Sequence, residues 1–226
     1  IDIVKGSVKI TEQKTPWRLK EALGYLKKDY DVCLIDTRPV FDMLTMNALY
    51  AAAVTPDIII GDFDSADKKI LAFFQQNKEI DFCTLNPEKD DTDTEFAIRE
   101  SIRRGADSIT IIGGTGTRLD HVLGNISLLG IGLEEGVRME LLDAHNRICM
   151  IDHSVTLKKK EQYGNYLSLI PYNGNVTGVT LKGLKYPLHD YTMGGFNSLG
   201  ISNEIVDDEA SIELTSGQLL VIESRD

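Results

Sequence analysis

The chain has 226 residues, of which 42% are hydrophobic and 26% are charged, a composition typical of ordinary globular proteins. Its 35 acidic residues outnumber its 24 basic residues, so the formal charge at pH 7 is −11. Because such an acidic chain repels nucleic acids and anionic membranes, and its longest basic block is only Lys158–Lys160, we expect neither as a partner.

The sequence lacks the signals of membrane insertion, secretion and disulfide bonding. No apolar stretch reaches the roughly 20 residues of a membrane-spanning helix, and residues 1–10 show no signal-peptide core. Cys33, Cys83 and Cys149 are far apart, which argues against a disulfide framework and a thiolate zinc site. We therefore expect core cysteines in a cytoplasmic protein.

The first two-thirds of the chain alternate short apolar runs with segments of helical period. The predicted strands are Val32–Ile35, Asp57–Ile60, Ser108–Ile112 and Met139–Leu142. The predicted helices are Trp17–Leu26, Leu44–Ala53, Lys68–Gln76, Thr94–Arg103 and Leu119–Leu129. This alternation is typical of βαβ units, so we expect a mainly parallel three-layer α/β/α catalytic domain over residues 1–146.

The pattern changes after about Arg147. Short β-rich runs follow one another, namely Cys149–Ile151, Val155–Leu157, Tyr166–Ile170, Val176–Leu181, Ala210–Leu214 and Gln218–Ile222. Turn signals such as Asn173–Asn175 and Ser216-Gly217 separate them. We expect a C-terminal all-β sandwich domain over residues 147–226.

A pair of carboxylates follows the second predicted strand. Asp62 and Asp64 come directly after the run from Ile58 to Gly61, where ligands of open α/β sheets bind. Two neighbouring carboxylates repel each other unless they share a cation, and their hard oxygens suit Mg²⁺. A purely structural alternative is that Asp64 or Ser65 caps the next helix.

A second acidic segment runs from Lys89 to Glu95. Thr92 and Glu95 fit a capping box, so helix chemistry explains part of it. The density of Asp90, Asp91 and Asp93 exceeds what a helix end needs, and a nearby metal or cationic substrate would explain it. Both interpretations stay open from the residues alone.

A glycine-rich segment, residues 113–121, follows the strand Ser108–Ile112 and leads into a helix. Backbone N–H groups at the helix start, together with Arg118, can cradle an anion. The glycine spacing fits neither a Walker A motif nor a dinucleotide fingerprint. His121 could donate to a phosphate or simply pack, and a tight turn is the structural alternative for the glycines.

Together these segments resemble bacterial thiamine pyrophosphokinases. The similarity spans about Thr55 to Ile222 and comprises Pro56-Asp57, Gly61–Ser65, Lys89–Glu95, Gly113–His121, Leu181–Leu188 and Leu199–Glu204, in the order found in the family. It implies an α/β catalytic domain with a β-sandwich, a homodimer with active sites at its interface, and transfer of the pyrophosphoryl group of ATP to the hydroxyl of thiamine.

The resemblance also implies roles for individual residues. Asp62, Asp64, Asp90 and Asp93 match the catalytic acidic set, with Mg²⁺ on Asp62, Asp64 and Asp90. The ATP side comprises Ser65, Gly114, Thr115, Gly116, Arg118, Asp120 and His121. Ser202 and Asn203 match the thiamine-contacting pair, supplied by the partner subunit. Within the set, Asp93 is our choice for the group that accepts or orients the hydroxyl proton.

The N-terminal part departs from the family pattern. The strand Val32–Ile35 leads to Asp36-Thr37-Arg38-Pro39 rather than to an aspartate with two glycines, and Asp42 is a second candidate for that aspartate. Thr117 also stands where a further glycine is common. Two other functions stay open: a Mg²⁺-dependent transferase with another acceptor alcohol, and a non-catalytic protein that binds thiamine or a nucleotide.

Overall fold

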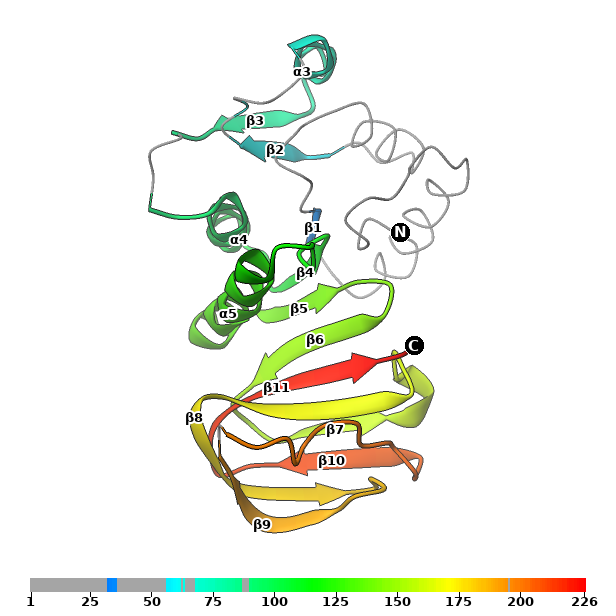
Figure 1. Cartoon of the computed structure of the whole chain (residues 1–226). Helices are drawn as coiled ribbons and strands as arrows, with labels where there is room; N and C mark the ends of the chain where they lie inside the picture. Colours follow the sequence, from blue (N-terminus) through cyan, green and yellow to red (C-terminus); the bar gives the residue numbers. More distant parts are fainter. Residues whose placement is uncertain (1–31, 36–55, 62, 64–67, 87–89, 195) are drawn as a thin grey trace. The chain divides into compact units, whose positions relative to one another are not determined.

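The computed structural model describes residues 32–35, 56–61, 63, 68–86, 90–194 and 196–226 (Figure 1). The chain divides into two compact units, Ile1–Asn125 and Ile126–Asp226, and the division falls inside one long helix. Among the described residues, no helix is long and apolar enough to cross a membrane.

The first unit contains two pairs of parallel strands. β1 (Val32–Ile35) pairs with β4 (Ser108–Ile112), and Ile35 lies opposite Ile112. β2 (Ile58–Gly61) pairs with β3 (Asp81–Thr84), and Gly61 lies opposite Thr84. All five residues of β4 are buried, which explains its continuous run of apolar and β-branched side chains.

Three helices connect or follow these strands: α3 (Lys68–Gln75), α4 (Asp93–Arg103) and α5 (Leu119–Glu135). The predicted cap of α4 is confirmed, because Thr92 Oγ1 accepts a hydrogen bond of 3.1 Å from the Glu95 N–H. At the other end of α4, Arg104 forms an ion pair of 2.8 Å with Asp81 at the start of β3. The predicted helices Trp17–Leu26 and Leu44–Ala53 lie outside the described residues.

The second unit is built from antiparallel strands (Figure 1). They are ordered β5-β6-β11-β8-β10-β7, and β9 pairs with β8. Their bounds are β5 (Arg138–Leu142), β6 (Asn146–Ile151), β7 (Val155–Lys158), β8 (Tyr166–Lys182), β9 (Leu188–Met193), β10 (Glu209–Glu213) and β11 (Ser216–Ser224). A short 3₁₀ turn, Lys159–Glu161, follows β7.

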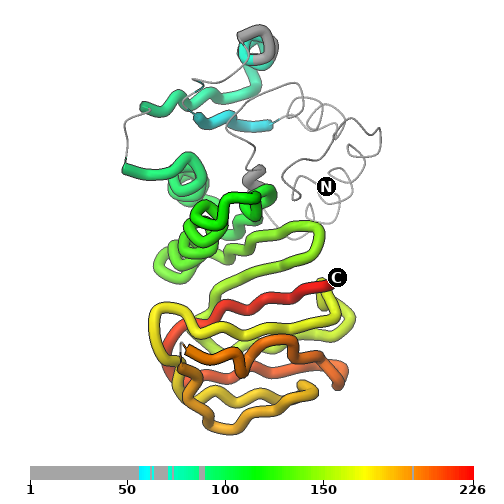
Figure 2. Tube along the Cα trace, in the orientation of Figure 1, coloured from blue at the N-terminus to red at the C-terminus, as the bar shows by residue number. Residues whose placement is uncertain are grey.

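β8 curls this sheet into two facing layers (Figure 2). Its first part, Tyr166–Tyr172, pairs with β11, and its second part, from Val176, pairs with β9 and β10. At the bend, Asn173 and Gly174 have φ angles of 57° and 130°. The layers enclose one apolar core, which includes Leu167, Leu169, Val176, Val179, Leu181, Ile212, Leu219 and Val221.

The predicted fold class is confirmed: parallel strands with helices are followed by a β-rich part that contains a curled antiparallel sheet. The predicted break at Asn173–Asn175 is wrong, because β8 bends there and continues. Cys83 and Cys149 are free thiols. Burial, together with the nearby charges of Glu140 and Glu223, raises the pKa of Cys149 to about 12, so this thiol stays protonated near neutral pH.

An ion pair joins β6 to the C-terminal strand. Arg147 contacts Glu223 at 2.5 Å, and Glu223 is only 4% exposed. The second carboxylate oxygen accepts a hydrogen bond of 2.8 Å from the Tyr163 N–H. The guanidinium of Arg225 lies 4.7 Å from the centre of the Tyr163 ring. The buried Glu223 carboxylate therefore has both a cation and a backbone N–H as partners.

We expect Arg147→Met to destabilise the protein by about 3–5 kcal/mol, because it leaves the buried Glu223 carboxylate without its cation. The matched control is Arg103→Met, which removes an exposed helical pair with Glu100 and should lower the stability much less, because solvent screens that pair. Urea unfolding curves measure both changes. Equal losses for the two variants would show that burial does not strengthen the Arg147 pair.

Candidate functional site

The glycine-rich loop leaves the carboxyl end of β4 as predicted. Gly113 has a φ of 90°, a conformation that glycine adopts without strain. The Asn125 side chain of α5 donates a hydrogen bond of 2.9 Å to the Gly114 carbonyl oxygen. Because Asn125 is only 6% exposed, this bond is shielded from water and holds the loop against the helix.

Among the described residues, one buried side-chain oxygen of this loop has no hydrogen-bond partner. Thr115 Oγ1 is buried and unpaired among the described residues. An unpaired buried hydroxyl is costly, and a ligand oxygen would satisfy it. Beyond it, the loop from Gly116 to α5 is exposed. The loop therefore offers a polar atom and a helix start to an incoming anion.

Charged residues lie at the N-terminus of α5. Arg118 and Asp120 form an exposed ion pair of 2.5 Å, and hydrogen bonding to Arg118 holds the pKa of Asp120 below its usual range. Asp120 in turn raises the pKa of Arg118. His121 follows and is also exposed. A phosphate group would thus meet a guanidinium that a neighbouring carboxylate already orients.

The acidic residues are only partly described. Asp90 and Asp93 are exposed, and Asp93 is the first residue of α4. Asp62, Asp64 and Ser65 lie outside the described residues, and those described form no group of three metal-ligating side chains. Since β2 and β3 run parallel with Gly61 opposite Thr84, the segments that lead to Asp62 and Asp90 leave the same edge of that pair.

The segment that carries Ser202 and Asn203 lies along the free edge of β8. Asn203 exchanges two main-chain hydrogen bonds with Leu167, of 2.8 and 2.9 Å, and the Leu169 N–H donates to the Gly200 carbonyl oxygen at 2.8 Å. A Cβ atom at Gly200 would lie 2.1 Å from the Leu169 oxygen, so only glycine allows this close approach. Main-chain hydrogen bonds therefore attach the segment to β8.

The two predicted thiamine contacts differ in exposure. Ser202 is exposed and has a φ of 58°, and its N–H donates a hydrogen bond of 3.0 Å to Ser168 Oγ. Asn203 is only 6% exposed. Hydrogen bonds to β8 thus hold the segment, and Ser202 itself is exposed. It belongs to the second unit, whereas the glycine-rich loop belongs to the first.

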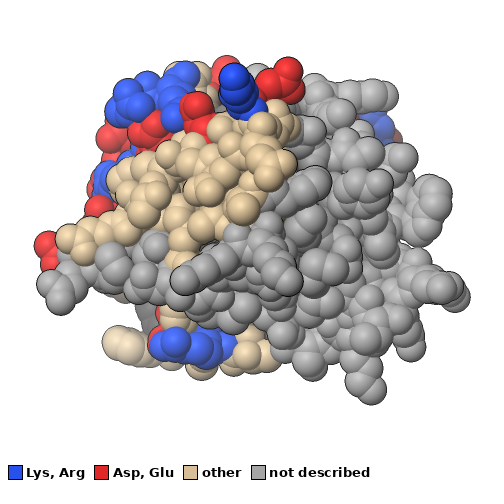
Figure 3. Space-filling view, turned by 90° about the horizontal axis from the view of Figure 1, so that it is seen from above, with Lys and Arg blue, Asp and Glu red and all other residues tan. Residues whose placement is uncertain are grey.

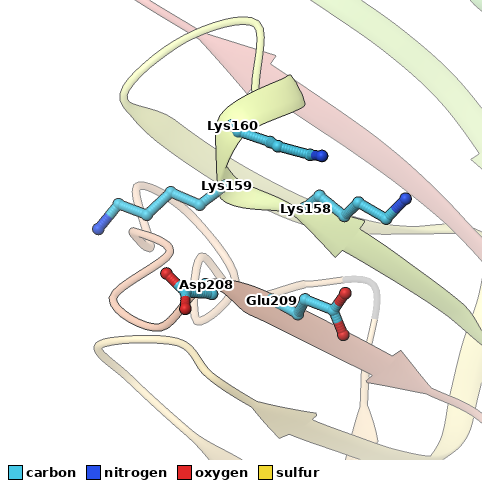
Figure 4. A pocket seen from close by; sticks show the side chains of 5 residues that line it. All are labelled: Lys158, Lys159, Lys160, Asp208 and Glu209. Atoms are coloured by element: carbon cyan, nitrogen blue, oxygen red, sulfur yellow. The ribbon is translucent and has the colours of Figure 1, made fainter.

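Two further features of the described surface show how its charges are distributed. A hollow of about 470 Å³ is lined by three lysines and two acids, namely Lys158, Lys159, Lys160, Asp208 and Glu209 (Figure 4). On the face seen in Figure 3, basic and acidic side chains lie among each other over the described residues. Neither feature of the described surface is a basic patch of the kind that binds nucleic acid.

Comparison with known proteins decides the family. Residues 44–141 match the catalytic domain of thiamin pyrophosphokinase, and residues 152–219 match its vitamin B1 binding domain. The chain belongs to the thiamin pyrophosphokinase family. Thiamine pyrophosphokinase activity follows from this membership, so the predicted function and enzyme class, a transferase, are confirmed.

Individual relatives agree with this assignment. Thiamine pyrophosphokinase from Bacillus subtilis is 32% identical over 183 residues, which cover 79% of this chain and 83% of the relative. The crystal structure of thiamin pyrophosphokinase from Geobacillus thermodenitrificans is 31% identical, with a TM-score of 0.75 and coverage of 90% and 91%. The one from Candida albicans is 15% identical with a TM-score of 0.68, which shows a shared fold; the match covers 85% of this chain and 88% of that one.

The N-terminal part has a second similarity. Residues 1–62 match the model of an AAA domain, and this match overlaps the catalytic-domain match over residues 44–62. The overlap region follows Val32–Ile35 and Asp36–Pro39, where the sequence departs from the kinase pattern. The departure therefore coincides with a stretch that is similar to a different family.

Asn125 holds the glycine-rich loop, a role that sequence reasoning missed. Its signal is a polar side chain at helical spacing from the apolar Val122, Ile126 and Leu129, on the face of α5 that packs inward. A polar residue on such a face needs a partner, and the Gly114 carbonyl oxygen provides it.

We expect Asn125→Ala to raise the KM for ATP by roughly tenfold, because Gly114 loses its buried hydrogen bond and the loop loosens. The KM for thiamine should change little. The matched control is Ser127→Ala, two residues further along α5, whose hydroxyl accepts from Tyr172. Steady-state kinetics with each substrate varied in turn measures the effect. A larger rise for thiamine than for ATP would contradict this role for Asn125.

Proposed function

We propose that the protein transfers the pyrophosphoryl group of ATP to the hydroxyl oxygen of thiamine, giving thiamine diphosphate and AMP. The observation that carries this proposal is the pair of consecutive family matches, a catalytic domain and a vitamin B1 binding domain, in one chain. The reaction needs a positioned nucleophile, screening of the polyphosphate charge and stabilisation of the leaving phosphate.

The glycine-rich loop is our candidate for holding ATP. The buried, unpaired Thr115 Oγ1 and the oriented guanidinium of Arg118 support this role, because both can donate to phosphate oxygens. We assign the ATP side to Ser65, Gly114, Thr115, Gly116, Arg118, Asp120 and His121. Asn125 holds the Gly114 peptide from behind.

The acidic residues are our candidates for the metal and the proton. We propose that Asp62, Asp64 and Asp90 hold Mg²⁺, since carboxylate oxygens suit this ion and the two segments that lead to these residues leave one edge of β2 and β3. Bound Mg²⁺ would screen the polyphosphate charge of ATP in this acidic protein. Asp93, exposed at the start of α4, would orient the thiamine hydroxyl and accept its proton.

We assign thiamine binding to Ser202 and Asn203 of the domain that spans residues 147–226, next to a catalytic domain over residues 1–146. The exposure of Ser202, whose N–H is held by Ser168, supports this. Thiamine is a cation, and an acidic protein favours it electrostatically. We also propose a cytoplasmic location, where ATP is available.

We further propose a homodimer with active sites at its interface. Large apolar side chains near Ser202 are exposed: Leu199 is 51% exposed and Ile201 is 46% exposed. A second copy of the chain that covers them would remove apolar surface from water. Sedimentation equilibrium should give twice the chain mass of 25.1 kDa. A monomer at assay concentrations with full activity would contradict the shared site.

The decisive assay measures AMP released from ATP and Mg²⁺ with and without thiamine. We expect AMP release to depend on thiamine and to stop when EDTA removes the metal. Release with another alcohol but not with thiamine would indicate a transferase with a different acceptor. ATP binding without any AMP release would indicate a binding protein.

In the same assay, Asp62→Asn and Asp64→Asn should each lower kcat by at least about 100-fold, because the proposed metal site loses a charge. The matched control is Asp57→Asn, which changes an exposed acid at the other end of β2 and should leave kcat near the wild-type value. Near-normal AMP production by both site variants would remove Asp62 and Asp64 from the metal site.

A further inference from the structure

The bend of β8 contains an asparagine that is followed by a glycine. Asn173-Gly174 is the only pair of this kind in the sequence. Both residues are exposed, and a Cβ atom at Gly174 would find no other group within 4 Å. Because glycine has no side chain, the Gly174 main-chain nitrogen is open to approach from the Asn173 side chain.

The ladders on both edges of β8 are interrupted at this pair. Toward β11, the pairing stops at Tyr172 and resumes at Thr177. Toward β9, it begins only at Val176. Among the described residues, the ladders therefore leave Asn173 and Gly174 without a Cα partner, and the main chain can turn there without breaking strand pairing.

An asparagine side chain and the peptide that follows it can react with each other. The main-chain nitrogen of the next residue gives its proton to water and attacks the side-chain carbonyl carbon. The new C–N bond closes a succinimide ring, the bond to the side-chain nitrogen breaks, and ammonia leaves. Water then opens the ring at either carbonyl group. The products are aspartate and isoaspartate, in which the main chain runs through the former side chain, and no oxidant or reductant takes part.

We propose that Asn173 is a site of spontaneous modification, where water converts the side-chain amide to aspartate and isoaspartate and releases ammonia. Gly174 supplies the attacking nitrogen. Three observations favour the reaction here: the pair is exposed, its main chain lies outside the ladders, and Gly174 has no Cβ atom to block the attack.

Two other exposed asparagines lack this combination. Asn175 precedes Val176, a buried and β-branched residue that hinders attack by its own nitrogen. Asn197 already uses its side-chain oxygen, which accepts a hydrogen bond of 3.2 Å from the Leu199 N–H. We therefore expect the modification to select Asn173.

The isoaspartate product would alter the bend of β8. It adds a methylene group to the main chain, whereas the residues on either side are anchored. The Tyr172 hydroxyl donates a hydrogen bond of 2.5 Å to Ser127 of α5, and Val176 is fully buried in the apolar core. A longer main chain between two anchored residues must displace one of them, so we expect the isoaspartate form to be less stable.

Ageing of the folded, full-length protein in mildly alkaline buffer tests the site. Digestion and mass spectrometry should show the mass change from asparagine to aspartate, with fragmentation placing it at Asn173 and isoaspartyl methyltransferase labelling part of the product. The rate in the folded protein should lie within about threefold of the rate in urea, because strand pairing does not protect the pair. Asn175 and Asn197 are internal controls that should convert at least about tenfold more slowly.

Two variants control for the effect on stability. Asn173→Gly removes the reacting amide and tolerates the φ of 57°, and Asn173→Asp adds the charge without lengthening the main chain. Ageing should lower the urea midpoint of the wild type and leave that of Asn173→Gly unchanged, and fresh Asn173→Asp should stay closer to fresh than to aged wild type. Folded protein that stays unconverted while the unfolded chain reacts, or equal rates at Asn173 and Asn175, would overturn the proposed site. Equal midpoints for fresh and aged wild type would overturn the effect on the bend.

Discussion

The second unit depends on a single strand that changes partners along its length. Because β8 pairs first with β11 and then with β9 and β10, the sheet folds over and buries an apolar core between its two layers. A seventeen-residue strand can do this only where its backbone bends, and Asn173 and Gly174 provide positive φ angles at that point. The other edge of the first part of β8 binds the segment with Ser202 and Asn203 through main-chain hydrogen bonds.

In each unit, a buried asparagine holds a segment that carries predicted site residues. Asn125 and Asn203 are each 6% exposed, and each places its amide on a main-chain oxygen, of Gly114 in one unit and of Tyr186 in the other. A buried amide that satisfies a loop peptide fixes that loop more firmly than an exposed side chain can. Groups that would face a ligand, such as Ser202 and Arg118, can then remain exposed and still be oriented.

The sequence predicts elements well where one strong local signal decides them. β1 and β4 have the predicted bounds. β3 was missed because Asp81–Thr84 is short and partly exposed, so it shows no apolar run. α5 was predicted to end at Leu129 but extends to Glu135; a Cβ atom at Gly132 would lie 2.5 Å from the Val137 oxygen, so this glycine serves packing and does not end the helix.

Contacts between distant segments mark the limit of such reasoning. The Asn-Gly sequence within Asn173–Asn175 is typical of a turn between two strands. Here it is a bend within one strand, because β8 pairs with β11 before it and with β9 after it. Likewise, the motif identifies Asn203 as a site residue, but its amide faces Tyr186, 17 residues earlier in the chain. No spacing rule encodes that pairing, because the main chain of β8 brings the two segments together.

The strand β1, in the N-terminal part of the chain, shows that strand pairing does not depend on the family pattern of the sequence. β1 lies within the residues that match an AAA domain and outside those that match the kinase catalytic domain, yet it pairs in register with β4. Parallel pairing uses main-chain groups, so a short apolar strand from either family can satisfy it. The chemistry depends instead on the residue types that follow each strand. After β4 these are the glycines of the kinase family, whereas after β1 the sequence continues as Asp36-Thr37-Arg38-Pro39. Family character is therefore kept in the loop after β4, which we propose to hold ATP, and it differs after β1.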